Sequence, residues 1–235
     1  MNKIIIALTA LIINLHAAEI YATFNVLAQK NAALAFNASG IVNAVHTDIA
    51  NSVNKGDILA SLENSDVKAN LQSAQVAYKY AARDYERQQQ VKHLIDASAF
   101  DAYALRYEST KAHLAYMQAL LDKTYLKAPF DGVITFKEIE IGDTVNGMML
   151  KTVFKIQSTH ERKLLVEFDQ KYYQDVHVGD TFEYKLDGQQ KVYRGTISKI
   201  YPLANANNRK IQAEVQAKDL LVGLFGDGII ITQDR

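Results

Sequence analysis

A catalytic or metal site would depend on histidine, cysteine or paired carboxylates, and this chain offers few of them at a useful spacing. It has six histidines and no cysteine. Five histidines lie beyond the apolar N-terminus, and none has the close spacing of zinc ligands: His46, His93, His113, His160 and His177. Soft ligands for copper or silver are also scarce, since the chain has four methionines.

The acidic residues give no catalytic pattern either. Glu138 and Glu140 alternate along one expected strand, which is typical of a solvated face. The sequence contains no glycine-rich phosphate loop and no nucleophile elbow. We therefore expect no catalytic residue, no metal and no cofactor, and predict that the protein is not an enzyme.

The charge balance argues against one class of partner. Lys and Arg together number 26, as do Asp and Glu, in 235 residues, so the formal net charge is zero. Nucleic-acid binding needs a basic face, and no run of Lys and Arg provides one. We expect no nucleic-acid partner.

Residues 1–18 predict a secretory signal peptide. Lys3 is its positive residue, Ile4 to Leu15 form its apolar stretch, and Ala17 precedes a suitable cleavage site. The stretch is shorter than the roughly 20 residues that a membrane-spanning helix needs. The chain also lacks a cysteine for lipidation. We expect export, with the mature protein soluble in the cell envelope.

Two separated stretches of the chain share one pattern. In residues 39–59 and 131–150, a glycine begins an alternating apolar run, and a Gly-Asp turn follows. Neither stretch has enough apolar surface for a core of its own. The two halves must therefore pack on each other.

Glycines mark equivalent points of the two halves. The spacing from Gly40 to Val53 equals the spacing from Gly132 to Val145. We expect four glycines to form the structural turns of these halves: Gly40, Gly56, Gly132 and Gly142.

The segment between the halves, residues 64–124, has the period of two long helices. Its apolar and aromatic residues recur at alternating spacings of three and four, the heptad pattern of a coiled coil. The seam positions are Val67, Leu71, Ala74, Tyr78, Ala81, Tyr85 and Gln88, then Phe100, Tyr103, Tyr107, Thr110, Leu114, Met117 and Leu121. Ser98 with Asp101 is a helix-start signature. Because the halves must meet, we expect an antiparallel coiled-coil hairpin.

Residues 159–235 predict a separate β-rich domain. Short stretches alternate between apolar and polar residues, and Asp187-Gly188 is a hairpin signal. About six such strands would close into a small barrel, because closure leaves no exposed edge.

With these parts in place, the chain resembles a known family. Half-motifs that flank a helical hairpin, together with the run LKAPFDGVI at 126–134, are similar to the periplasmic adaptor proteins, also called membrane fusion proteins or the HlyD-like family. The resemblance implies that residues 19–63 and 125–158 form the two halves of a lipoyl-like, or barrel-sandwich hybrid, domain. The expected fold class is mostly β with a long α-helical coiled-coil hairpin that splits the lipoyl-like domain, followed by a small β-barrel.

The resemblance implies a function in transport. Family members link an inner-membrane transporter to an outer-membrane channel and assemble as hexamers. As partners we expect an inner-membrane efflux pump of the resistance–nodulation–division type, an outer-membrane channel and further copies of the chain. The expected location is the periplasm, with the protein associated with the inner membrane through its partners. An adaptor for an ATP-driven (ABC-type) exporter is one alternative. A non-transport, exported coiled-coil structural or adhesive protein is another.

The resemblance also implies a docking tip. In the family, an Arg, a Leu and a Ser near the end of the hairpin contact the channel. Arg87 and Ser98 have the matching separation, and Val91 stands where the family has Leu. The alternative is that Arg87 is an ordinary solvated charge and that Ser98 only caps a helix.

Cofactor carriers share the lipoyl-like fold but not this arrangement. Lipoyl and biotin carrier domains present a Lys on the turn between their halves. Here the helical segment occupies that turn, and Lys68 and Lys123 lie on its expected helices. We therefore expect no attached lipoyl or biotin.

Overall fold

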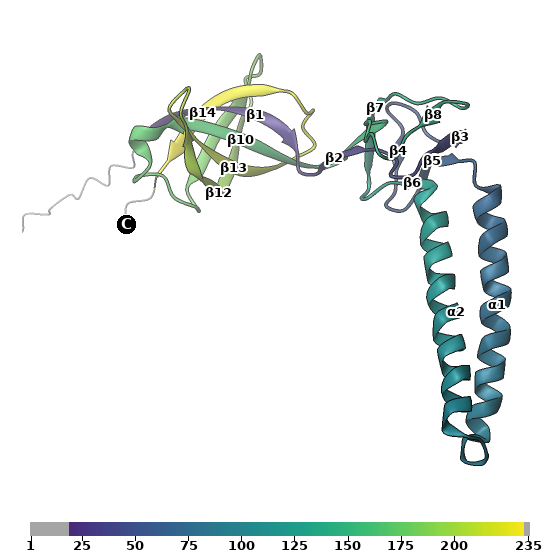
Figure 1. Cartoon of the computed structure of the whole chain (residues 1–235). Coiled ribbons are helices and arrows are strands. Elements are labelled where there is room, and N and C mark those ends of the chain that lie inside the picture. Colours follow the sequence, from purple (N-terminus) through teal and green to yellow (C-terminus); the bar gives the residue numbers. More distant parts are fainter. Residues whose placement is uncertain (1–18, 233–235) are drawn as a thin grey trace, which may run out of the picture. The chain divides into compact units, whose positions relative to one another are not determined.

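Figure 1 shows the computed structural model of the chain, which describes residues 19–232. The predicted signal peptide at residues 1–18 lies outside the described residues. The chain divides into two compact units, which we call the barrel unit (described at 19–29 and 160–232) and the two-half unit (Lys30–Thr159). No helix within residues 19–232 is both long and apolar enough to cross a membrane.

The barrel unit forms a closed antiparallel β-barrel from six of the described strands. Each strand pairs with two neighbours, so none of the six leaves an open edge. In order around the barrel they are β1 (Glu19–Ala28), β10 (Glu161–Asp169), β13 (Lys210–Lys218), β12 (Val192–Asn205), β11 (Thr181–Leu186) and β14 (Phe225–Ile231). A short 3-10 helix, η2 (Gln170–Tyr172), follows β10.

Strand β1 belongs to the barrel unit, whereas the sequence predicted that residues 19–63 lie in the lipoyl-like domain. Every second side chain of β1 is buried in the barrel: Ile20, Ala22, Phe24, Val26 and Ala28. The strand pairs with β10 on one side and with β14 on the other. Without β1, both of those neighbours would have an open edge. The predicted boundary at residue 19 is therefore wrong, and the two-half unit begins at Lys30.

The two-half unit contains two four-stranded sheets among its described residues, and each sheet takes strands from both halves. One sheet has the order β2 (Asn31–Leu34), β9 (Phe154–Ser158), β7 (Gly132–Lys137) and β4 (Ser52–Val53). The other has the order β6 (Tyr125–Lys127), β5 (Ile58–Leu62), β3 (Gly40–Val45) and β8 (Thr144–Val145). Side chains from both halves share one core, among them Phe36, Leu59, Leu62, Ile134, Phe154 and Ile156.

The pairing between the halves is reciprocal. Gly40 pairs with Val145, and Gly132 pairs with Val53. The glycine of each half thus lies opposite the valine of the other half, which explains why the sequence repeats the spacing between them. The two halves therefore form one folded domain.

The four glycines do not all lie in turns. Gly40 and Gly132 are the first residues of β3 and β7, so the prediction of turns is wrong for these two. Gly56 and Gly142 do lie in turns, each with a φ of 93°. In both turns, the aspartate after the glycine accepts a hydrogen bond from the backbone N–H three residues earlier, at 2.7 and 2.9 Å.

Two long helices occupy the segment between the halves. Helices α1 (Ser65–Gln90) and α2 (Ala97–Lys123) lie side by side, and a turn with the 3-10 helix η1 (Lys92–Leu94) joins them (Figure 1). We call α1, η1 and α2 the helix pair. Strands β5 and β6, which precede and follow it, pair with each other. Asn64, just before α1, donates a hydrogen bond to the hydroxyl of Thr124, just after α2, at 2.9 Å. Both ends of the helix pair are thus fixed at one place.

Candidate functional site

Aromatic rings from the two helices pack against each other. The ring centres of Tyr85 and Tyr107 are 5.0 Å apart, those of Tyr85 and Phe100 are 5.6 Å apart, and those of Tyr78 and Tyr107 are 5.8 Å apart. Ala81, one turn before Tyr85, is 1% exposed, so a small residue lies among these large ones. Rings at such distances attract each other beyond their apolar burial. They fix which residues of α1 face which residues of α2.

The turn between the helices exposes an apolar side chain. Leu94 in η1 is 73% exposed, and Val91, which ends α1, is 36% exposed. The ammonium group of Lys92 lies 4.6 Å from the centre of the Phe100 ring, which attaches the turn to the start of α2. Leu94 is not among the docking residues predicted from the sequence. Its position could have identified it, because Leu94 lies in the break between the two heptad seams, where no opposing helix can cover it.

Arg87 lies in the last turn of α1, and its guanidinium group already has a partner. Nη2 of Arg87 pairs with Oδ1 of Asp84, and Nη1 of Arg106 on α2 lies 3.9 Å from the other carboxylate oxygen. The Arg87 side chain is 73% exposed, whereas the Asp84 side chain is 27% exposed. These three side chains together carry a net positive charge close to the turn.

Ser98 does not cap α2, contrary to the prediction from its spacing to Asp101. Asp96 precedes the helix, and its carboxylate accepts the backbone N–H of Ser98 at 2.8 Å and also the Ser98 hydroxyl. The hydrogen bond from this hydroxyl, followed by those from the backbone N–H groups of Ser98 and Ala99, holds the pKa of the Asp96 carboxyl below its usual value. An ionised carboxylate also interacts well with the positive end of a helix. Asp96 therefore has the role predicted for Ser98.

The three predicted docking residues thus lie at the turn end of the helix pair. Arg87 is in the last turn of α1, Val91 is its C-cap, and Ser98 is in the first turn of α2. Lys68 and Lys123, considered above for cofactor attachment, lie within α1 and at the end of α2. The turn end offers an apolar side chain beside cationic groups, which suits contact with another protein.

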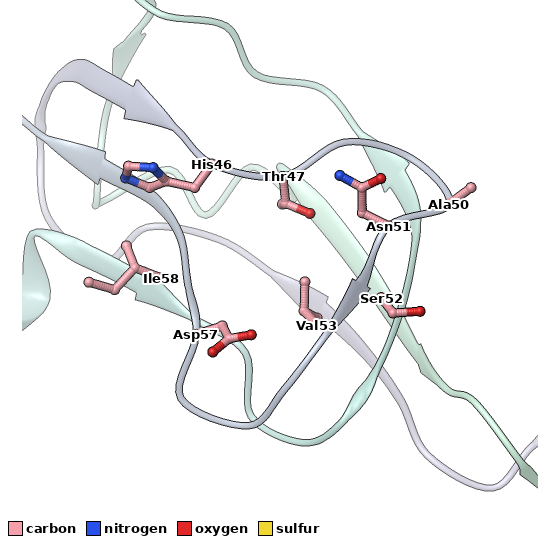
Figure 2. Close-up of a pocket in the computed structure, with 8 residues that line it drawn as sticks. All are labelled: His46, Thr47, Ala50, Asn51, Ser52, Val53, Asp57 and Ile58. Atoms are coloured by element: carbon pink, nitrogen blue, oxygen red, sulfur yellow. The ribbon is translucent and has the colours of Figure 1, made fainter.

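The two-half unit also has an open, polar pocket in its first half (Figure 2). Its volume is about 590 Å³, and its polar lining includes His46, Asn51, Ser52 and Asp57. Across residues 19–232, no three His, Cys, Asp or Glu side chains gather in a way that could hold a metal ion. The pocket offers hydrogen-bonding groups rather than a set of metal ligands.

Comparison with known families identifies the two-half unit. A family model described as the CzcB-like barrel-sandwich hybrid domain matches residues 30–157. An uncharacterized protein of Haemophilus influenzae is 24% identical over an alignment of 204 residues, which covers 83% of this chain and 53% of that protein. Multidrug resistance protein MdtA of Salmonella heidelberg is 27% identical over an alignment of 142 residues, which covers 54% of this chain and 34% of MdtA. The chain therefore spans about half the length of the first relative and about a third of the second.

Solved structures share the fold. A MacA–MexA chimeric protein with the α-hairpin domain of Pseudomonas aeruginosa MexA aligns with a TM-score of 0.81 at 18% identity, over 93% of this chain and 82% of that one. Membrane fusion protein Spr0693 from Streptococcus pneumoniae aligns with a TM-score of 0.71 at 15% identity, over 92% of this chain and 100% of that one. At these identities, the likeness establishes the fold alone.

Proposed function

Because this chain belongs to the CzcB-like barrel-sandwich hybrid family of membrane fusion proteins, or periplasmic adaptor proteins, we propose that it is an adaptor for efflux across the cell envelope. It links an inner-membrane transporter to an outer-membrane channel and performs no chemistry of its own. The observation that carries the proposal is one β domain split by a pair of long helices, whose ends are fixed together at β5 and β6.

The pump in this proposal is of the resistance–nodulation–division type. One relative of this chain is named a multidrug resistance protein, which supports efflux of drug-like compounds. An ATP-driven exporter is the alternative pump. Purification of the protein with its membrane partners distinguishes the two, because a nucleotide-binding subunit would accompany only the second.

In this proposal the helix pair is a coiled-coil hairpin that works as a spacer. The ring contacts of Tyr78, Tyr85, Phe100 and Tyr107 support it, because all four occupy seam positions of the heptad pattern. Helices of this length reach about 40 Å at roughly 1.5 Å per residue. The turn end then lies far from the strands of the two-half unit, where a channel can reach it.

The proposed docking tip consists of Arg87, Val91 and Ser98, with Leu94 as its apolar anchor. Leu94 is twice as exposed as Val91, so it offers the larger apolar contact. Arg87 can donate hydrogen bonds to a carboxylate or carbonyl of the channel. Ser98 contributes less in this scheme, because its hydroxyl already donates to Asp96.

Export and assembly complete the proposal. We propose that residues 1–18 are a cleaved signal peptide and that the mature protein works in the periplasm, at the inner membrane through its pump. Self-association into a ring of copies would let the helix pairs enclose a conduit. Cell fractionation tests the location, since the mature protein should lack Lys3.

Photo-crosslinking from position 94 in cells tests the docking tip. The expected product is a covalent adduct with an outer-membrane channel. Leu105 provides a matched control, because it is also a leucine with 73% exposure but lies within α2. A crosslinker at position 105 should not capture the channel.

Arg87→Asp adds a functional readout to the crosslinking. The fold should survive, because surface ion pairs contribute about 0–1 kcal/mol. Docking should weaken, because the variant places two carboxylates beside the channel's acceptor groups. Cells should then become more sensitive to the exported compounds. If export is normal and position 94 captures only inner-membrane proteins, the tip assignment is wrong.

A further inference from the structure

One end of the β-barrel contains a pocket that the adaptor role does not use. It lies where β1 ends and β10 begins, and its volume is about 600 Å³. Its lining includes Gln29, Tyr184, Tyr193 and Leu220, which are buried or half-buried. We call its exposed charged residues, Glu161, Arg194 and Lys218, the rim. A volume of this size is typical of small-molecule sites, which also occur at the mouths of β-barrels.

Two aromatic rings form a fixed wall of this barrel-end pocket. Tyr184 on β11 and Tyr193 on β12 are direct cross-strand partners, with ring centres 5.5 Å apart and planes 16° apart. Tyr184 is 5% exposed, and its ring also packs 5.1 Å from Phe24 and 5.4 Å from Phe182. Because these neighbours hold Tyr184 in place, the wall is preorganised for another flat ring.

Gln29, which lines the pocket, has an amide oxygen without a partner. Oε1 of Gln29 is buried and accepts no hydrogen bond from any described residue. A buried acceptor in this state is unfavourable. A donor on a ligand satisfies it when the amide turns its oxygen toward the pocket. The terminal torsion of a glutamine has broad minima, so the amide can turn its oxygen toward the pocket. The amide therefore favours ligands that carry a hydrogen-bond donor.

Charges at the rim are balanced. Lys218 faces Glu161 across the β10–β13 ladder, and the guanidinium group of Arg194 pairs with Glu183. Neither sign of charge dominates the entrance, so the rim does not select for organic cations or anions. An uncharged ligand fits this environment best.

We propose that the barrel-end pocket binds an uncharged, planar aromatic compound that carries a hydroxyl or amine donor. The ring of the compound packs against Tyr184 and Tyr193, and the donor bonds to the Gln29 amide. This site is independent of the docking tip and of any transporter, so it can be tested with the purified full chain.

Titration calorimetry with two matched probes tests the site. 2-Naphthol has a hydroxyl donor, and 2-methoxynaphthalene has the same rings without it. The wild-type protein should bind 2-naphthol about tenfold more tightly, the effect of roughly one hydrogen bond. Gln29→Leu should abolish this preference while keeping the binding of 2-methoxynaphthalene.

Two tyrosine variants distinguish binding in the pocket from nonspecific binding to the protein surface. Tyr193→Ala should weaken both probes at least about tenfold, because it removes part of the aromatic wall. Tyr173→Ala is the control, since Tyr173 is 62% exposed and does not line the pocket. Circular dichroism verifies the fold of each variant, and Gln29→Leu tests the site even if Tyr193→Ala does not fold. The proposal is overturned if the wild-type chain binds neither probe, if Gln29→Leu keeps the preference, or if Tyr173→Ala equals Tyr193→Ala.

Discussion

The strands of the two-half unit form one β domain, which we call the split domain because the helix pair divides it. Its two halves have the same backbone arrangement but different residues. Val42 in the first half exchanges backbone hydrogen bonds with the loop at Gly142, at 2.8 and 2.9 Å. Ile134, its equivalent in the second half, exchanges them with the loop at Ala50, at 2.8 and 3.0 Å. The two crossings thus have the same geometry. The difference in residues shows which features the fold requires and which it merely tolerates.

The loops themselves differ in backbone strain. Gly142 has a φ of 93°, and Ala50 has a φ of 69°. A left-handed conformation costs a residue with a side chain about 1–2 kcal/mol, whereas glycine adopts it readily. The first half therefore carries strain that the second half avoids.

Three residues before each loop, the halves differ in polarity. Thr47 stands in the first half where Ile139 stands in the second, and they are 8% and 3% exposed. The Thr47 hydroxyl has no hydrogen-bond partner among the described residues. Burial of such a group is unfavourable, whereas burial of the Ile139 side chain is favourable. Thr47 and Ala50 therefore each make the first half less stable than their counterparts make the second half.

The largest expected difference between the halves concerns the strand glycines. A Cβ at Gly132 would overlap the carbonyl oxygen of Gln157 and lie 2.8 Å from Cγ1 of Ile156, whereas at Gly40 the nearest atoms are on Leu62, at 3.5 Å. Gly132→Ala should lower the free energy of unfolding by about 3 kcal/mol, and Gly40→Ala by less than about 1 kcal/mol. Urea unfolding followed by circular dichroism measures both. Equal effects would mean that the strands are not this close at Gly132.

The buried hydroxyl gives the next difference. Thr47→Val should raise the free energy of unfolding by about 1 kcal/mol, because it removes an unsatisfied polar group and keeps the shape. The reciprocal change, Ile139→Thr, should lower it by about 2 kcal/mol. The same urea titration applies. A destabilised Thr47→Val protein would indicate that the hydroxyl has a partner in solution.

The smallest difference concerns the left-handed loops. Ala50→Gly should raise the free energy of unfolding by about 0.5 kcal/mol, because relief of strain exceeds the added chain entropy. Gly142→Ala should lower it by about 1 kcal/mol. Thermal midpoints of the two variants should shift in opposite directions. Shifts of the same sign would argue against a left-handed backbone at Ala50.

Much of this domain could be predicted because its features depend on residue type. A Gly-Asp pair predicts a turn, since glycine accepts a positive φ and the aspartate accepts a nearby backbone N–H. Gly56 and Gly142 confirm this with identical φ values of 93°. The equal Gly-to-Val spacing predicted that the halves are equivalent, and the reciprocal strand pairs confirm that they form one domain.

Other features could not be predicted, because they depend on distant partners. Nothing in residues 19–28 marks them as barrel strand β1, since alternation predicts a strand but not its neighbours. The Gly-Asp pattern predicts that Gly142 corresponds to Gly56. The backbone hydrogen bonds instead show that Gly142 corresponds to Ala50, a residue type that does not predict a left-handed backbone. At the candidate site, Asp96 and Ser98 are both good helix caps by type, and only the geometry of the turn distinguishes them.

The pairing of β1 with β14 has a consequence for the order in which the chain folds. Glu19 lies opposite Ile231, so the first described strand cannot complete its pairing until the last one has emerged. The split domain likewise cannot form until the residues after α2 have emerged, because they supply its second half. Local contacts form fastest, and closing long loops delays distant ones. We therefore expect folding from the inside outward: the helix pair first, the split domain around its base next, and the barrel last.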